Sequence, residues 1–294
     1  MTPDDIADQL AALRDAGVRL KRRPYRELLE ALGAVLEGWR NPDSAWRREL
    51  VEQLPAATGF TAPLVREGLQ RALDGWTRDA LRELALRELG SPEDLDAESS
   101  RSVDGWDVTA VWLAGSIPMP SLLALIAPLA VRSPVLAKAA SRDPVTPDLV
   151  ARSIEETDAE LGRCIRIASF PAQRLDLTDA LLQADCVCAT GSDEAIAALR
   201  ARAGPARHFV ADGHRFSVAA VAPPDGAQLR VELAQRLAVD VALWDQLGCL
   251  SPIEVFAVDR DASFAIALGE ALAGALAHAE KIWPRGSIDA RAAH

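Results

Sequence analysis

The feature that most constrains the fold of this chain is an alternation, from about residue 105 onward, of short apolar runs with helical segments. Strands are predicted at 108–113, 135–138, 164–169, 185–190 and 208–211, and helices at 121–131, 147–161, 176–183 and 192–203. Strands that alternate with helices in this way are typical of βαβ units, whose strands lie parallel in one sheet. The sequence therefore predicts an α/β fold with a Rossmann-like sheet.

The N-terminal region follows a different period. Between residues 4 and 89, apolar side chains such as Leu28, Leu32 and Leu36 recur at helical spacing. Residues 91–100 are polar, acidic and poor in apolar side chains. We therefore expect a helical N-terminal region over 1–98 and a domain boundary before the α/β segment.

Charge and cysteine content narrow the classes of function. A net charge of -11 argues against nucleic acid as a partner, because phosphate binding needs clustered Lys and Arg. The four cysteines have no C-x-x-C spacing, which indicates reduced thiols and a cytoplasmic location. Residues 1–5 lack the pattern of a signal peptide, and the most apolar stretch, 117–131, is too short and proline-rich to span a membrane.

Three predicted strand ends carry candidate ligand-binding residues. In parallel sheets, ligands bind at the carboxyl ends of strands, where helix N-termini offer positive potential. Gly115 and Ser116, Lys138, and Gly191 with Ser192 occupy such ends. The alternative is structural: the glycines make tight turns, Ser192 caps a helix and Lys138 is solvated. The dinucleotide fingerprint G-x-G-x-x-G is absent from the sequence.

A single cysteine is the candidate nucleophile. A predicted helix, 227–244, leads to Gly248 and Cys249, and Pro252 precedes a β-rich run at 253–258. Gly248 can adopt backbone angles that let a carbonyl approach the sulfur closely, and Pro252 prevents a helix from continuing. The alternative is a small buried hydrophobe at a strand start.

Five segments occur in a characteristic order. They are Gly-Ser-Ile-Pro at 115–118, Leu-Ala-Lys-Ala-Ala-Ser at 136–141, Thr-Gly-Ser-Asp-Glu at 190–194, Ala-Asp-Gly-His-Arg at 211–215 and Asp-Gln-Leu-Gly-Cys-Leu-Ser-Pro at 245–252. This set resembles the aldehyde dehydrogenase superfamily and, more closely, its acyl-CoA reductase branch of the LuxC type. The resemblance covers about residues 105–258, and the helical N-terminus looks similar to that branch as well.

The resemblance implies a nucleotide cofactor-binding α/β domain over 105–244 and the start of an incomplete catalytic domain of aldehyde dehydrogenase type over 245–294. It implies that Cys249 accepts the acyl group, with no metal. It also implies a cofactor site that includes Lys138 near the adenosine ribose and Gly191 and Ser192 beside the pyrophosphate and nicotinamide, together with Gly115, Ser116 and Ser141.

The implied activity is NADPH-dependent reduction of a fatty acyl-CoA thioester to an aldehyde through a cysteinyl acyl-enzyme. Ser141 stands where a family glutamate contacts the ribose and repels a 2′-phosphate, and Arg142 follows, so NADPH should be accepted at least as well as NADH. Ala211 replaces the glutamate that activates water in hydrolytic members, which favours reduction or transfer over hydrolysis. Expected partners are acyl-CoA or another acyl donor and further subunits of a homo-oligomer or hetero-complex.

Two other functions stay open. Only 45 residues follow Cys249, whereas the family's catalytic domain continues much further. The chain is therefore expected to be truncated and to turn over poorly, and a non-catalytic or impaired paralogue that binds nucleotide or assembles subunits is the alternative. A Cys-His hydrolase that uses His208 or His214 lacks any family signature around Cys249.

We also expect Cys249 to be the one reactive cysteine of the four. Cys186 and Cys188 lie on one face of a predicted buried strand, and Cys164 opens another strand. Burial in a medium of low dielectric raises a thiol pKa and suppresses the reactive thiolate.

Overall fold

The computed structural model describes residues 1–96, 105–205, 207–223, 227–258 and 262–287. The chain divides into two compact units: unit 1 is Met1–Gln53 with Gln70–Gly213, and unit 2 is Leu54–Leu69 with His214–His294. The predicted boundary between 98 and 105 lies outside the described residues, so the predicted domain limits stay a prediction. Two helices, α3 (Ala45–Thr58) and α4 (Ala62–Leu73), contribute residues to both units.

Unit 1 contains a five-stranded parallel sheet with the order β3-β2-β1-β4-β5. Its strands are β1 (Thr109–Trp112), β2 (Val135–Lys138), β3 (Ile165–Ala168), β4 (Cys186–Thr190) and β5 (His208–Asp212). Every residue of β1 and β2 is buried, as expected for strands covered on both faces. The predicted α/β class with a parallel sheet is confirmed.

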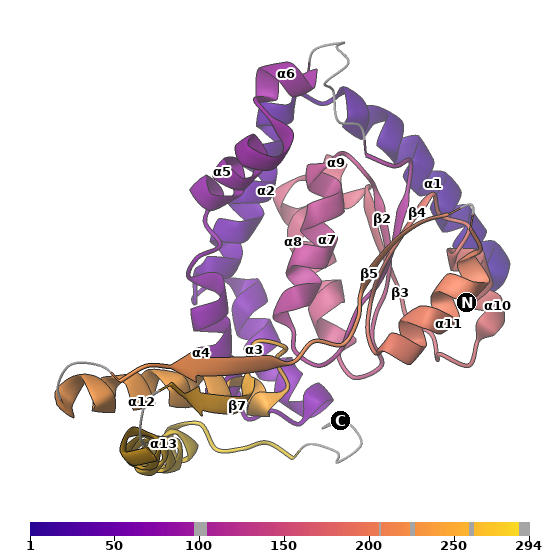
Figure 1. Ribbon diagram of the computed structural model, residues 1–294. Coiled ribbons are helices and arrows are strands. Elements are labelled where there is room, and N and C mark those ends of the chain that lie inside the picture. The colour runs from indigo at the N-terminus through magenta and orange to yellow at the C-terminus, as the bar shows by residue number, and fades with distance from the viewer. Residues whose placement is uncertain (97–104, 206, 224–226, 259–261, 288–294) are drawn as a thin grey trace. The chain divides into compact units, whose positions relative to one another are not determined.

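Helices cover both faces of this sheet (Figure 1). Besides the parts of α3 and α4 that belong to it, unit 1 contains the helices α1 (Pro3–Arg22), α2 (Tyr25–Arg40), α5 (Arg78–Leu89), α6 (Pro92–Asp96), α7 (Met119–Ala130), α8 (Val145–Thr157), α9 (Ala159–Gly162), α10 (Leu175–Leu181) and α11 (Asp193–Ala203), of which α5 and α6 pack on α2 and not on the sheet. Side chains of α1, α10 and α11 join one core cluster with β1 and β4, and α7 and α8 lie toward the other face. Helix α1 is thus part of the sheet's own core.

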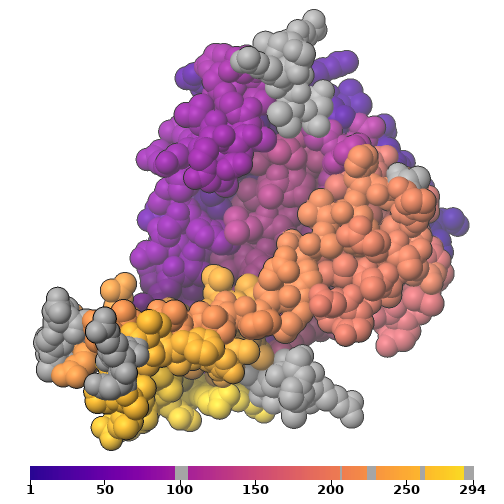
Figure 2. All heavy atoms as spheres, viewed as in Figure 1, coloured from indigo at the N-terminus to yellow at the C-terminus, as the bar shows by residue number. Residues whose placement is uncertain are grey.

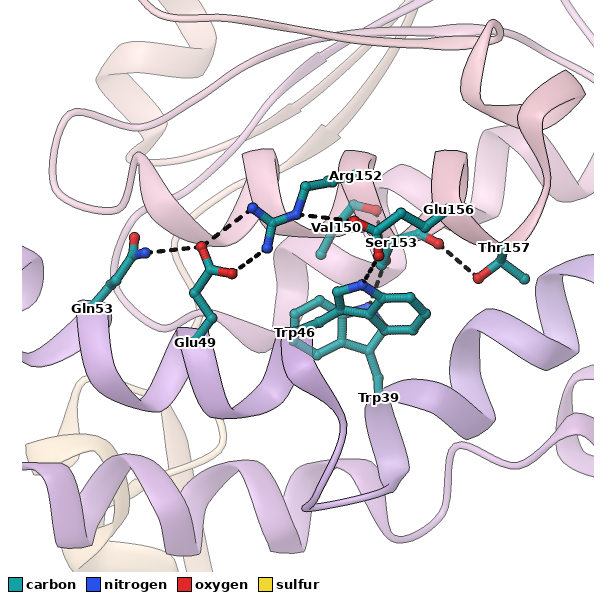
Figure 3. A network of polar contacts seen from close by, with 9 residues as sticks. All are labelled: Trp39, Trp46, Glu49, Gln53, Val150, Arg152, Ser153, Glu156 and Thr157. Carbon is teal, nitrogen blue, oxygen red and sulfur yellow. Dashed lines mark hydrogen bonds and ion pairs between the residues drawn. The ribbon is translucent and has the colours of Figure 1, made fainter.

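A polar network ties the N-terminal helices to α8 within unit 1 (Figure 3). The buried Trp39 donates through Nε1 to Ser153 Oγ at 2.9 Å, and Ser153 Oγ donates to the Val150 carbonyl oxygen at 2.7 Å. Glu49 of α3 pairs with Arg152 of α8. The N-terminal helices therefore fix the helix that follows β2.

Unit 2 contains a two-stranded parallel sheet, β6 (Ser217–Val221) and β7 (Pro252–Ala257), and two long helices. Helix α12 (Ala227–Ala242) leads into the one-turn segment η1 (Leu243–Gln246), and α13 (Ala262–Ile282) follows β7. Its core includes Val221, Leu237 and Phe264.

Helix α13 was not predicted from the sequence. By length and composition it is apolar enough to cross a membrane. Its most apolar stretch of 18 residues has a mean hydropathy of 1.4, and 17% of that stretch is buried. Figure 2 shows its residues, in gold to yellow, on the surface. The expectation of no membrane span therefore stays a prediction.

Several predicted boundaries were wrong in detail. Ser121 does not cap a helix, because α7 already begins at Met119 and Ser121 is buried. The predicted helix 147–161 is divided at Asp158, whose carboxylate caps α9. The helix predicted to reach residue 244 ends at Ala242, two residues before the backbone becomes left-handed at Trp244.

Candidate active site

Three predicted cofactor positions lie at neighbouring strand ends in unit 1. Strand β1 pairs with β2 on one side and β4 on the other, and Trp112 lies opposite both Lys138 and Ala189. The strand order reverses at β1, since β2 and β3 extend the sheet to one side and β4 and β5 to the other. Such a switch point is where sheets of this class bind ligands.

Gly115 follows β1 at a point where no side chain fits. A Cβ atom there would lie 2.7 Å from the Cβ of Ala140 and 3.1 Å from that of Arg142. The segments after β1 and β2 are therefore packed tightly together, and they present Ser116 and Ser141 to solvent.

Lys138 is buried at the end of β2, with a relative exposure of 8%. Its Nζ donates to the Ala139 carbonyl oxygen at 3.3 Å and lies 5.3 Å from the centre of the Phe170 ring. Within the described ranges it makes no ion pair, and burial lowers its pKa. The alternative of a solvated lysine is wrong, and a buried cation without a counter-charge suits an anionic or polyhydroxyl ligand.

Ser192 caps α11, since its Oγ accepts a hydrogen bond from the Ala195 N–H at 3.2 Å. The Gly191 N–H donates to the Asp212 carbonyl oxygen at 3.2 Å. The structural interpretation of these two residues therefore holds, and the exposed helix N-terminus beside them keeps the ligand-binding interpretation open.

Asp143, which was not predicted from the sequence, is 2% exposed and lies beside Gly115. Its Oδ1 accepts a hydrogen bond from the Thr146 N–H at 2.9 Å, and its Oδ2 has no partner among the described residues. Burial raises the pKa of this carboxyl. An Asp just before a predicted helix is a common N-terminal capping residue, and this pattern in the sequence could have indicated Asp143.

In unit 2, Cys249 lies at the tip of a turn. The Ser251 N–H donates to the Gly248 carbonyl oxygen at 2.9 Å, which leaves Cys249 and Leu250 in the middle of the turn. Both are exposed, Leu250 by 83%. Ser217 Oγ donates to the Cys249 carbonyl oxygen at 2.7 Å and ties the turn to β6. The alternative of a buried cysteine is wrong.

The turn also offers hydrogen-bond donors beside the thiol. The N–H groups of Cys249 and Leu250 make no hydrogen bond with any residue of the described ranges. Backbone donors that are not already used can stabilise negative charge on a reacting carbonyl oxygen.

The backbone that leads to this turn is left-handed at three non-glycine residues. Trp244, Asp245 and Gln246 have φ values of 57°, 52° and 66°. For L-residues this conformation costs roughly 1–2 kcal/mol per residue. Asp tolerates it better than most residues do, but nothing in the sequence signals a tryptophan at positive φ.

The other cysteines are less exposed than Cys249. Burial raises the pKa of Cys164 to about 11. Cys186 and Cys188 share a hydrogen bond that lowers the pKa of Cys186 and raises that of Cys188. The pKa of Cys186 is therefore not raised as expected, because this hydrogen bond outweighs the effect of burial. Of the two histidines weighed for a hydrolase, His208 stacks on Trp106 at 3.8 Å between ring centres.

Comparison with known proteins shows the family to which the chain is similar. A family model described as Acyl-CoA reductase (LuxC) matches residues 21–294. The chain is 23% identical over 239 residues to a long-chain acyl-protein thioester reductase of Photorhabdus luminescens, covering 78% of this chain and 49% of that protein. A protein with the same description from Photorhabdus laumondii is 22% identical over the same shares. The chain thus spans about half the length of these relatives.

Solved structures of aldehyde dehydrogenases share the fold. An NAD-dependent benzaldehyde dehydrogenase from Corynebacterium glutamicum gives a TM-score of 0.72 at 20% identity, covering 94% of this chain and 59% of that one. An NADP-dependent glyceraldehyde-3-phosphate dehydrogenase from Bacillus halodurans gives 0.68 at 16% identity, covering 94% and 57%. The resemblance deduced from the sequence segments is confirmed.

Proposed function

We propose a function from the premise that this chain belongs to the acyl-CoA reductase (LuxC) family: it takes part in the reduction of an acyl thioester to an aldehyde, with Cys249 as the acyl-accepting thiol. The observation that carries the proposal is the exposed Cys249 at the tip of a turn whose two N–H donors have no partner among the described residues. Acyl transfer needs these two features, a reachable sulfur and donors for the oxyanion.

The acyl-transfer step uses groups of this chain. The Cys249 thiolate attacks the carbonyl carbon of acyl-CoA, and the C=O electron pair moves to oxygen, where the N–H groups of Cys249 and Leu250 can donate to it. The oxyanion then collapses, the bond to the CoA sulfur breaks, and the CoA thiolate takes up a proton. The product is a thioester between the acyl group and Cys249.

The strand ends of unit 1 fit a nicotinamide nucleotide. Gly115 lets the segments after β1 and β2 pack closely beside the strand ends, and Lys138 is a buried cation with no counter-charge within the described ranges. Lys138 would bind ribose hydroxyls or a phosphate, Ser116 and Ser141 would line the site, and Gly191 and Ser192 would bring the α11 N-terminus to the pyrophosphate. When bound, the reduced cofactor supplies the hydride that converts the acyl group to an aldehyde.

We propose NADPH as the cofactor, since Ser141 carries no charge that would repel a 2′-phosphate. We propose a fatty acyl-CoA as the acyl donor. An acyl-protein thioester is the second donor class, because the Photorhabdus relatives are described as long-chain acyl-protein thioester reductases. The location proposed is cytoplasmic, without a membrane span, metal or nucleic-acid partner, in a homo-oligomer or hetero-complex.

The second candidate function is a non-catalytic or impaired module that binds nucleotide or assembles subunits. It is favoured by the buried Lys138 at a strand end of unit 1, which suits an anionic ligand whether or not Cys249 reacts. This module would take the acyl group, if at all, without releasing aldehyde.

Intact-mass analysis after mixing with a fatty acyl-CoA, with and without NADPH, tests the proposal. We expect an acyl adduct on wild type, none on Cys249→Ala, and discharge of the adduct as aldehyde when NADPH is added. A stable adduct that NADPH does not discharge would favour the module. No adduct, or an adduct on the alanine variant, would contradict the assignment of Cys249.

A further inference from the structure

The left-handed stretch before Cys249 makes side-chain contacts with other segments of unit 2. Trp244 has φ 57° and ψ 30°, and Asp245 has φ 52° and ψ 34°. A bulky residue adopts these angles only where its surroundings impose them. The contacts of the two side chains show what imposes them here.

Trp244 fills a slot between α4 and the segment before it. The residue is 6% exposed, and its ring meets that of Phe60 edge-on, with centres 5.4 Å apart at 67°. A Cβ atom on Gly68 would lie 2.3 Å from Cζ2 of the indole and 2.5 Å from Cε2. The slot therefore exists because residue 68 has no side chain.

Asp245 is tied to the chain that follows α13. It is 7% exposed, and its Oδ2 accepts a hydrogen bond from the Gly286 N–H at 3.0 Å. The Ser287 N–H in turn donates to the Gly59 carbonyl oxygen at 2.9 Å. Three segments that are far apart in sequence thus meet around the left-handed turn.

Hydrogen bonds connect the left-handed stretch to the turn that carries Cys249. The Leu247 N–H donates to the Trp244 carbonyl oxygen at 3.0 Å, and Gln246 Nε2 donates to the Pro252 carbonyl oxygen at 3.1 Å. These bonds bracket Cys249 on both sides. A shift of the indole would therefore move the turn that carries the thiol and the N–H groups of Cys249 and Leu250.

We propose that Trp244, seated in the slot left by Gly68, and Asp245, tied to Gly286, are positioning residues that hold Cys249 and its N–H donors in the geometry for acyl transfer. The inference rests on the proposed role of Cys249. It assigns a function to the α4 segment, which supplies the slot for the tryptophan in front of the nucleophile.

The chain offers a matched pair of variants. Gly68 of α4 and Gly38 of α2 both face a tryptophan, and a Cβ on Gly38 would lie 2.4 Å from the Trp46 ring. Gly68→Ala and Gly38→Ala therefore make the same kind of clash in different units. A misplacement of about 1 Å can slow a reaction roughly a hundredfold, so we expect at least about a tenfold slower acylation in Gly68→Ala. We expect less than about a twofold change in Gly38→Ala.

The readout is single-turnover acylation by a fatty acyl-CoA, followed by intact mass, with the acyl-CoA concentration at half-maximal rate measured in parallel. The maximal rate should fall in Gly68→Ala while that concentration stays within about twofold. Adding Trp244→Phe to Gly68→Ala should restore the rate, since the smaller ring leaves room for the methyl group. Equal rates in the two alanine variants, or no rescue by phenylalanine, would overturn the inference.

If Gly68→Ala does not fold, Asp245 provides the second test. Asp245→Asn keeps an oxygen acceptor for the Gly286 N–H and should retain most of the rate, whereas Asp245→Ala should lose at least about tenfold. Equal rates in these two variants would also overturn the inference. An adduct that persists in Cys249→Ala would instead refute the proposed function itself, so the two failures are distinguishable.

Discussion

The two candidate regions reach a defined geometry by different means. In unit 1, the predicted cofactor residues lie at the ends of strands β1, β2 and β4, which are paired on both sides, and β1 and β2 are buried along their whole length. In unit 2, Cys249 lies in the turn before β7, and the strands of its sheet are partly exposed, with Val218 50% exposed and Phe256 52% exposed. The first region is rigid through its backbone ladder, and the second depends on a few side-chain contacts.

This difference has a consequence for mutations. A parallel ladder distributes its stabilisation over many hydrogen bonds and buried side chains, so a change at one strand end leaves the rest in place. A strained turn depends on each contact that opposes its strain. We therefore expect the sheet of unit 1 to keep its structure when a residue at a strand end is substituted. We expect the Cys249 turn to lose its geometry when one of its side-chain contacts is removed.

The largest expected effect is at Cys249. Cys249→Ala removes the nucleophile and should lower the acylation rate by at least about 10⁴-fold, because the remaining donors have no attacking group to assist. Fluorescence titration with NADPH should give a Kd within about twofold of wild type, since no cofactor residue changes. A large loss of cofactor affinity would contradict the separation of roles between the two regions.

The next effect is a difference in thiol reactivity. A sub-stoichiometric alkylating reagent at pH 8 should label Cys249 at least about a hundredfold faster than Cys164, whose thiol is buried and whose pKa is raised to about 11. The rate at Cys164 should keep rising up to about pH 11, as its thiolate forms. Peptide mapping that finds most of the label on Cys164, Cys186 or Cys188 would refute the assignment.

A matched pair of valines compares the two sheets. Val135 of β2 is fully buried, and Val218 of β6 is 50% exposed. Val135→Ala should lower the free energy of unfolding by about 2–3 kcal/mol through lost burial and a cavity. Val218→Ala should change it by no more than about 0.5 kcal/mol. Urea unfolding measures both values, and a large loss in Val218→Ala would mean that its face of β6 is covered in solution.

The sequence predicted one of these regions far better than the other. The strand predicted at 135–138 has the bounds of β2, because a run of buried apolar residues between turn signals has a local cause. The positive φ of Trp244 has no local cause, since it depends on Gly68 and Phe60, which are distant in sequence. Helix α13 was missed because its many Ala and Gly residues blur the contrast between apolar and polar faces.

A smaller effect concerns the buried cation of unit 1. Lys138→Met should raise the free energy of unfolding by about 1 kcal/mol at neutral pH, since it removes a buried charge but keeps the volume. It should also weaken NADPH binding by about tenfold. Burial lowers the pKa of Lys138 from 10.5, so the folded state binds its proton less tightly and wild-type stability rises as the pH approaches 10.5.

The stability advantage of Lys138→Met should therefore shrink between neutral pH and about pH 10.5. Thermal unfolding at several pH values, with wild type as the reference, measures this trend. An advantage that grows with pH would contradict the sign, and unchanged NADPH affinity would remove Lys138 from the cofactor site.

The smallest expected effect is on cofactor choice. Ser141 is exposed after β2 and carries no charge, so NADPH should bind at least as tightly as NADH. Ser141→Glu places a carboxylate where we expect the 2′-phosphate and should weaken NADPH binding by about fivefold to tenfold, with NADH little changed. Ser141→Gln has nearly the same shape without the charge and should leave the ratio of the two Kd values within about twofold. Equal effects of the two substitutions would mean that shape rather than charge matters at residue 141, and much tighter NADH binding by wild type would place the adenosine ribose elsewhere.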